Sequence, residues 1–212
     1  MNTDPHRGQP IRRRGPDPAS ARLAVILVHG RGASAADILS LADEFGVPDV
    51  AYLAPESAEH TWYPHSFLAP MRDNEPFLSS ALGRVDRIVH DLWRDHQIGP
   101  ERIGLLGFSQ GACLSLEYAA RHAHRYAAVV GLSGGLIGPP GTPREYAAAM
   151  DGTPMFLGCS DVDPHIPLVR VHETAQVFRR IGAAVDQRIY PGMGHVVNRE
   201  EVAAVSALLT AA

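Results

Sequence analysis

Beyond about residue 20, short apolar runs alternate with longer segments in which apolar residues recur every three or four positions. Short apolar runs are typical of buried strands, and the three- and four-residue spacing is typical of amphipathic helices. Alternation of the two predicts an α/β fold in which helices cover both faces of a mainly parallel sheet. The predicted strands are residues 23–28, 50–53, 102–106, 127–132, 154–157 and 185–190.

Four helices follow from the same spacing. The longest apolar stripe begins at Phe77 and ends at Trp93, and Gly99-Pro100 then stops the helix. Further helices are predicted at residues 112–121, 168–181 and 200–209. Two long irregular stretches remain, residues 55–76 and 134–154. Loops of that length within an α/β domain are usually functional.

The first twenty residues differ from the rest of the chain. They hold four prolines, several arginines and almost no apolar residues, so they cannot bury enough surface to offset the entropy lost on ordering. We therefore expect residues 1–20 to form a flexible tail. A chain of 212 residues is within the size of one compact domain, and residues 21–212 are predicted to form a single α/β domain.

Charge and composition narrow the classes of partner. The formal net charge is −4 and the arginines beyond the first twenty residues are scattered, so a nucleic-acid partner is not indicated. No apolar run approaches the roughly 18 residues of a membrane-spanning helix. Two cysteines, Cys113 and Cys159, fit a reducing compartment. We expect a soluble, cytoplasmic protein, and no pattern in the sequence sets its oligomeric state.

The motif G-x-S-x-G occurs twice, centred on Ser109 and on Ser133. Such a motif places a nucleophilic serine on a sharp turn between a strand and a helix, where glycines avoid steric collisions. Ser109 follows a predicted strand and precedes a predicted helix, whereas Ser133 is followed by Gly138-Pro139-Pro140-Gly141, which cannot form a helix. We predict Ser109 as the nucleophile and Ser133 as a small residue that closes a strand.

His195 and one of two aspartates complete a candidate catalytic triad. His195 lies just after the last predicted strand, and neighbouring glycines allow its loop to bring the imidazole over the serine. Asp161 and Asp163 both follow the strand at residues 154–157, where the acid that orients the imidazole is expected. Asp163 is favoured because it lies deeper in the loop and Pro164 fixes the turn there. Asp161 is the alternative, with a turn-stabilising role otherwise.

Two backbone N–H groups are expected to form an oxyanion hole. One belongs to Gln110, which follows the nucleophile at the start of a helix, and the other belongs to Arg31 in the loop after the first predicted strand. Glycines on both sides of Arg31 permit a close approach of the backbone to the serine. His29 is expected to orient this loop.

Five motifs together resemble one known family. They are Val28-His29-Gly30-Arg31-Gly32, Thr61-Trp62-Tyr63, Gly107-Phe108-Ser109-Gln110-Gly111, Asp163-Pro164-His165-Ile166-Pro167 and Gly192-Met193-Gly194-His195. In this order they resemble the small carboxylesterase/phospholipase family of α/β-hydrolases, which includes acyl-protein thioesterases. The resemblance implies an α/β-hydrolase fold without a large cap domain, activity on carboxylic esters or thioesters, and Asp163 rather than Asp161 as the acid. Arg31 stands where the thioesterase branch usually has an apolar residue, which disfavours a long acyl substrate.

The sequence therefore predicts a serine hydrolase that cleaves small or medium carboxylic esters through an acyl-enzyme and needs no cofactor. The alternatives are an acyl thioesterase or lysophospholipase, and a ligand-binding module that keeps the fold without turnover. No ligand spacing such as His-Glu-x-x-His indicates a catalytic metal. An apolar wall over the serine is expected from residues of the first long loop, with His165 at the entrance. The loop residues are Trp62, Tyr63, Phe67, Leu68 and Met71.

Overall fold

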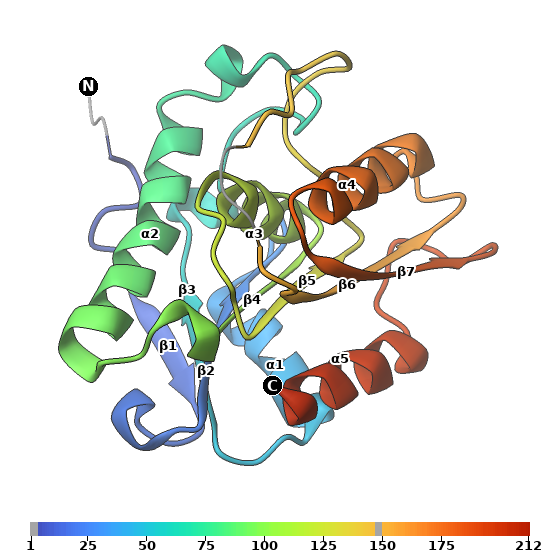
Figure 1. Ribbon diagram of the computed structural model, residues 1–212. Helices are drawn as coiled ribbons and strands as arrows, with labels where there is room; N and C mark the ends of the chain where they lie inside the picture. Colours follow the sequence, from blue (N-terminus) through green and yellow to red (C-terminus); the bar gives the residue numbers. More distant parts are fainter. Residues whose placement is uncertain (1–3, 147–149) are drawn as a thin grey trace.

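A computed structural model describes residues 4–146 and 150–212, and within them seven strands form one sheet (Figure 1). The strand order is β1-β3-β2-β4-β5-β6-β7, and neighbours are parallel except β1 and β3. The strands are β1 (Ile11–Arg14), β2 (Leu23–Val28), β3 (Val50–Pro55), β4 (Ile103–Phe108), β5 (Ala128–Leu132), β6 (Pro154–Ser160) and β7 (Ala184–Tyr190). The predicted mainly parallel sheet is confirmed.

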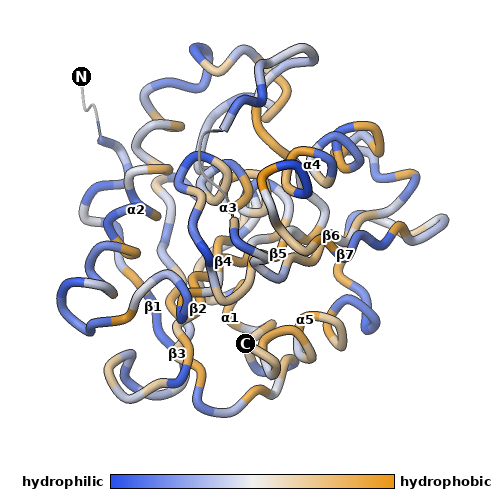
Figure 2. The backbone as a smooth tube through the Cα atoms, in the orientation of Figure 1, coloured by the Kyte–Doolittle hydropathy of each residue, from blue (hydrophilic) through white to orange (hydrophobic). Residues whose placement is uncertain are grey.

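Helices cover both faces of this sheet, as predicted. Helices α1 (Ala35–Phe45) and α5 (Arg199–Ala211) pack on one face, and α2 (Phe77–His96), α3 (Gln110–Arg121) and α4 (Leu168–Arg180) pack on the other (Figure 1). Each face buries its own apolar cluster, because every central strand is apolar on both sides. Figure 2 shows hydrophobic positions along the central strands and hydrophilic positions on the outer turns. No helix in the described ranges is long and apolar enough to cross a bilayer.

Strands β3, β4 and β6 each continue beyond the prediction at their carboxyl ends. The added residues include small or polar ones, such as Gly107 in β4 and Ser160 in β6, which still pair with the neighbouring strand. Helix α1 was absent from the prediction. Ser34 caps it by accepting a hydrogen bond from the N–H of Asp37, and the Asp37 side chain accepts from the backbone of Ser34 in return.

The prediction of a flexible tail over residues 1–20 is wrong for the described residues 4–20. Residues 11–14 form β1, which pairs antiparallel with β3 from Ile11 opposite Pro55 to Arg14 opposite Tyr52. Backbone hydrogen bonds to a free strand edge need no apolar side chains, so composition alone did not reveal this strand. Residues 1–3 of the predicted tail and 147–149 of the second irregular stretch lie outside the described residues.

His6 anchors the segment before β1 in the core. Its imidazole Nε2 donates to the carbonyl of Trp62 (2.9 Å), and Nδ1 accepts from the N–H of Ala58 (3.0 Å). The ring packs on Trp62 and edge-on against Phe77, and it is fully buried. Burial lowers the pKa of His6, so the neutral imidazole is the form present at pH 7.

Replacing His6 with alanine is expected to lower the free energy of unfolding by about 3 kcal/mol, because it leaves two buried backbone groups without partners and opens a cavity. Urea denaturation measures this change. Arg12→Ala is the matched control in the same segment, since Arg12 is exposed, and its effect should stay within about 0.5 kcal/mol. If the loss of unfolding free energy in His6→Ala is as small as that in Arg12→Ala, the segment before β1 adds nothing to stability.

Candidate active site

Ser109 occupies a strained turn between β4 and α3. Its φ of 55° and ψ of −120° are rare for a residue with a side chain. Two glycines make the turn possible. A Cβ on Gly107 would lie 2.3 Å from the backbone of Gly111, and one on Gly111 would lie 2.1 Å from the carbonyl oxygen of Val28. The sequence motif therefore corresponds to a steric requirement, and the turn holds the serine hydroxyl at the carboxyl ends of the strands.

The structure brings Ser109, His195 and Asp163 into one hydrogen-bonded chain. The Ser109 hydroxyl donates to Nε2 of His195 (2.8 Å), and Nδ1 of His195 donates to Oδ2 of Asp163 (2.7 Å). Asp163 lies in the loop after β6, and His195 lies in the loop after β7. The Asp163 side chain is fully buried, and that of His195 is 18% exposed. This is the arrangement of a nucleophile, a base and an orienting acid.

Asp163 is held as a carboxylate despite its burial. Burial alone would raise its pKa, but hydrogen bonds from His195 and from the N–H groups of His165 and Ile166 outweigh it, and the pKa lies below the ordinary value. A permanently charged carboxylate fixes the proton of His195 on Nδ1 and leaves Nε2 free to accept the serine proton.

Asp161 has a different position from Asp163. It is exposed, and its Oδ1 accepts the N–H of Gly192 (2.8 Å), three residues before His195. Asp161 therefore ties the loop after β6 to the loop that carries His195, which is the structural role expected for it.

Ser133, the centre of the second G-x-S-x-G motif, is fully buried after β5. Its backbone N–H donates to the carbonyl of Gly158 (2.7 Å), so it continues the ladder between β5 and β6. The hydroxyl has no route to an external substrate, and His195 is hydrogen-bonded to Ser109 instead.

The two predicted oxyanion donors belong to segments next to Ser109. Gly30, in the loop after β2, approaches so closely that an added Cβ would lie 3.4 Å from Cβ of Ser109. The N–H of Gln110 lies in the first turn of α3, where N–H groups have no partner within the helix. Neither it nor the N–H of Arg31 donates to another group within residues 4–146 and 150–212. Both donors remain available to an oxyanion.

Side chains hold the oxyanion loop in place. His29 is buried; Nδ1 donates to the carbonyl of Gly30 (2.8 Å) and Nε2 accepts from the N–H of Ser57 (3.3 Å). Burial lowers its pKa, so a neutral imidazole orients the loop. The Gln110 side chain fixes the facing segment, since its amide accepts from the N–H of Trp62 and donates to the carbonyl of Tyr63.

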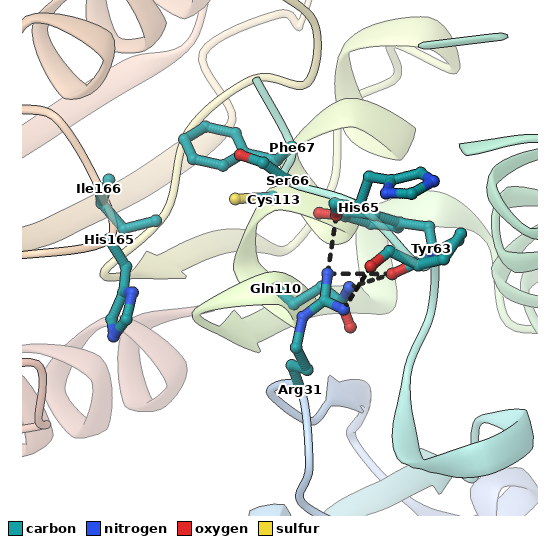
Figure 3. Close-up of a pocket in the computed structure, with 10 residues that line it drawn as sticks. Arg31, Tyr63, His65, Ser66, Phe67, Gln110, Cys113, His165 and Ile166 are labelled. Carbon is teal, nitrogen blue, oxygen red and sulfur yellow. Dashed lines mark hydrogen bonds between the residues drawn. The ribbon is translucent and has the colours of Figure 1, made fainter. Parts of the chain in front are cut away.

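Arg31 joins the same two segments through its guanidinium. It donates to the carbonyl oxygens of Tyr63 (3.0 Å), Pro64 (2.8 Å) and His65 (2.7 Å). Figure 3 shows the side chain rising from the loop after β2 to these carbonyls, with His165 and Ile166 on the opposite side. The predicted backbone donor is thus also a side-chain clamp, which the sequence did not indicate.

A cavity of about 250 Å³, here called cavity A, opens next to these residues (Figure 3). The ring of His165, which lines the cavity, lies 4.9 Å from the ring of His195. Its lining residues are Arg31, Tyr63, Pro64, His65, Ser66, Phe67, Gln110, Cys113, His165 and Ile166.

The residues expected to form the apolar wall and its entrance lie in different places. Tyr63, Phe67 and His165 line cavity A, whereas Trp62, Leu68 and Met71 do not. Trp62 is fully buried and its indole N–H donates to the carbonyl of His29 (2.9 Å), so it belongs to the core. Leu68 packs half-buried against the same core, and Met71 lines a separate cavity beside Arg121.

A second cavity of about 350 Å³, cavity B, is lined in part by His195. It was not predicted from the sequence. Its lining is mostly apolar and comes from α1, from the oxyanion loop and from the residues just after His195. These residues are His29, Gly30, Ala33, Asp37, Ile38, Ser40, Leu41, Phe108, His195, Val196 and Val197. The pair Val196-Val197 directly after the candidate base was the available sequence signal.

Comparisons with known proteins bear on the family and the fold. A family model described as Phospholipase/Carboxylesterase matches residues 16–212. A crystal structure of a phospholipase/carboxylesterase from Dyadobacter fermentans superposes with a TM-score of 0.91 at 38% sequence identity, covering 95% of this chain and 96% of that one. The carboxylesterase of Bacillus cereus superposes with a TM-score of 0.77 at 16% identity, covering 96% of this chain and 94% of that one, which shows the shared fold.

Among curated relatives, an acyl-protein thioesterase 1 from Gibberella zeae is 34% identical over 118 residues. The match covers 54% of this chain and 50% of the relative. The chain thus spans about half the length of the first curated relatives it matches.

Proposed function

Since the chain belongs to the phospholipase/carboxylesterase family, we propose that it hydrolyses small or medium carboxylic esters through an acyl-enzyme formed on Ser109. The observation that carries this proposal is the hydrogen-bonded chain from Asp163 through His195 to the Ser109 hydroxyl, at 2.7 and 2.8 Å. A non-catalytic ligand-binding module has no need of such a chain beside two vacant N–H donors.

The reaction proceeds in two halves. Nε2 of His195 takes the Ser109 proton as Oγ attacks the ester carbonyl, and the N–H groups of Gln110 and Arg31 hold the oxyanion. His195 then donates that proton to the leaving alcohol as the C–O bond breaks, leaving the acyl group on Ser109. Water attacks the acyl-enzyme as His195 takes its proton, and His195 then returns that proton to Oγ of Ser109 as the acyl C–O bond breaks and the carboxylic acid leaves.

The two cavities suggest an orientation for the substrate. Cavity B is lined by His195, which must reach the leaving oxygen, so it suits the alcohol. Cavity A is lined by Arg31 and Gln110, whose N–H groups would hold the carbonyl oxygen, so it suits the acyl group. An apolar alcohol and a short acyl group match the linings of the two cavities.

The second candidate is an acyl thioesterase, favoured by the similarity to acyl-protein thioesterase 1. The same steps would cleave a thioester, with a thiol leaving in place of the alcohol. The volume of cavity A, about 250 Å³, and the guanidinium at its edge favour short acyl groups instead.

We expect kcat/KM for p-nitrophenyl esters to peak at short acyl chains. Each further CH₂ gains about 0.8 kcal/mol only while the cavity has room to bury it. The assay compares acetate to decanoate esters with a palmitoyl thioester. Rates that rise to the longest soluble chain, or a thioester cleaved faster than every short ester, would move the protein to the thioesterase branch.

A pair of variants tests whether cavity A sets this length. Phe67 lines the cavity and its neighbour Leu68 does not. Phe67→Ala should shift the optimum towards longer acyl chains, whereas Leu68→Ala should leave it in place. An unchanged optimum in a folded Phe67→Ala protein would mean that the acyl group lies elsewhere.

We also propose a cytoplasmic location. Cys113 and Cys159 are both buried free thiols, as expected for a protein kept in a reducing compartment. Fractionation of producing cells, with activity found outside the cytoplasmic fraction, would contradict this location.

A further inference from the structure

The guanidinium of Arg31 gives the lining of cavity A its positive charge. The lining also holds the imidazoles of His65 and His165, and it holds no aspartate or glutamate. The carboxylate of Asp163 nearby is fully buried behind His195 and is already hydrogen-bonded to it. A ligand in this cavity therefore faces one guanidinium and several polar groups together with the apolar ring of Phe67.

Not all N–H donors of the Arg31 guanidinium are used by the hydrogen bonds to the carbonyl oxygens. A guanidinium has five N–H donors, and three hydrogen bonds to carbonyl oxygens use three of them. Within the described residues, no carboxylate pairs with Arg31. The contrast is with Arg144 and Arg170, which both pair with Glu173, at 3.2 and 2.8 Å.

The hydrogen bonds to three carbonyl oxygens preorganise Arg31 as an anion site. Three hydrogen bonds hold the planar guanidinium in one orientation, so a ligand need not pay the entropy of ordering it. Carbonyl dipoles do not neutralise a full charge, and the remaining donors can hydrogen-bond an anionic oxygen. Such charge-assisted hydrogen bonds are about twice as strong as neutral ones.

We propose that the acyl group of the preferred substrate carries a carboxylate, which Arg31 binds in cavity A. The substrate class is a half-ester of a short dicarboxylic acid, with the apolar alcohol in cavity B. This inference rests on the proposed esterase function and on the assignment of cavity A to the acyl group. Arg31 determines the specificity for this substrate. Its side chain binds the carboxylate, and its backbone N–H holds the oxyanion.

Two esters of nearly equal shape test the charge. Monomethyl succinate ends in a carboxylate, and methyl levulinate ends in a neutral acetyl group in the same place. The wild-type protein should show kcat/KM about tenfold higher for monomethyl succinate, as one charge-assisted hydrogen bond allows. Release of acid is followed by pH-stat titration. A ratio of one or below, with both esters hydrolysed, overturns the proposal.

The ratio of the two rates within each variant separates charge from loop structure. Arg31→Met should bring the ratio close to one, while Arg31→Lys should keep most of it, although both lose the carbonyl clamp. In the wild-type protein the ratio should also fall towards one in about 1 M NaCl, where the Debye length is about 3 Å. A ratio that survives Arg31→Met shows that Arg31 does not select the anion.

Binding to Ser109→Ala separates this inference from the esterase function. Isothermal titration of both esters into this variant should show the tighter affinity for monomethyl succinate. If the wild-type protein hydrolyses neither ester, the proposed function fails, and a tighter affinity for the anion still supports the anion site. Equal affinities, or no binding of either ester, overturn the anion site itself.

Discussion

Replacing Ser109 with alanine is expected to lower kcat for a short ester by on the order of 10⁵-fold or more. The substitution removes the atom that forms the acyl-enzyme, while the oxyanion donors and both cavities stay. Because alanine keeps the Cβ of serine and adds no atom to the strained turn at φ 55°, the fold should tolerate it, and circular dichroism with a thermal melt would verify this. Steady-state hydrolysis of p-nitrophenyl acetate measures the loss.

Ser133→Ala is the matched control for that experiment. Ser133 centres the other G-x-S-x-G motif but is buried after β5, and the imidazole of His195 is hydrogen-bonded to Ser109 instead. Its kcat should stay within about threefold of the wild type, as for a substitution outside the reacting groups. A folded Ser109→Ala protein with wild-type kcat would remove Ser109 from the mechanism.

Replacing Asp163 with asparagine is expected to lower kcat by about 10⁴-fold. The asparagine keeps the shape of the site, but its amide can hold the imidazole in the wrong tautomer, with the proton on Nε2. The substitution also removes the charge that stabilises the imidazolium. The pH dependence of kcat is the readout that a merely structural role would not move. Activity should recover in part as pH rises, when hydroxide can replace the base.

Asp161→Asn provides the comparison for the acid. Asp161 accepts one N–H from Gly192 and is exposed, and an asparagine oxygen can still accept that bond. Its kcat should fall by less than about tenfold. If Asp161→Asn lowers kcat more than Asp163→Asn while both proteins remain folded, the orienting acid has been assigned to the wrong aspartate.

Periodicity predicted the fold well where strands lie in the centre of the sheet. β2, for example, was predicted with its observed bounds, because its apolar run ends where the chain turns into a loop. Two elements, α1 and β1, were not predicted. The apolar positions of α1, such as Ile38 and Phe45, do have helical spacing, and the Ser34–Asp37 cap was a usable signal. β1 gave no such signal, because pairing with β3 uses backbone groups that every sequence has.

The candidate triad could be proposed from the sequence because each of its residues lies in a turn or loop that follows a strand, in a fixed order along the chain. The pocket was harder to predict. A loop residue such as Trp62 can face the core or the site, and composition does not distinguish them. Its indole N–H bond to the carbonyl of His29 decides the direction, and that bond exists only in the folded protein. Cavity B is lined in part by residues of α1, so it was not predicted when that helix was not predicted.

The most direct test of the account is covalent capture of the nucleophile. A fluorophosphonate probe reacts with a serine that is activated by a base beside an oxyanion hole. After labelling and tryptic digestion, mass spectrometry should find one adduct on Ser109, absent from Ser109→Ala and strongly reduced in Asp163→Asn. An adduct on Ser133, or no adduct on Ser109 under conditions that inactivate the enzyme, would contradict the assignment of Ser109 as nucleophile.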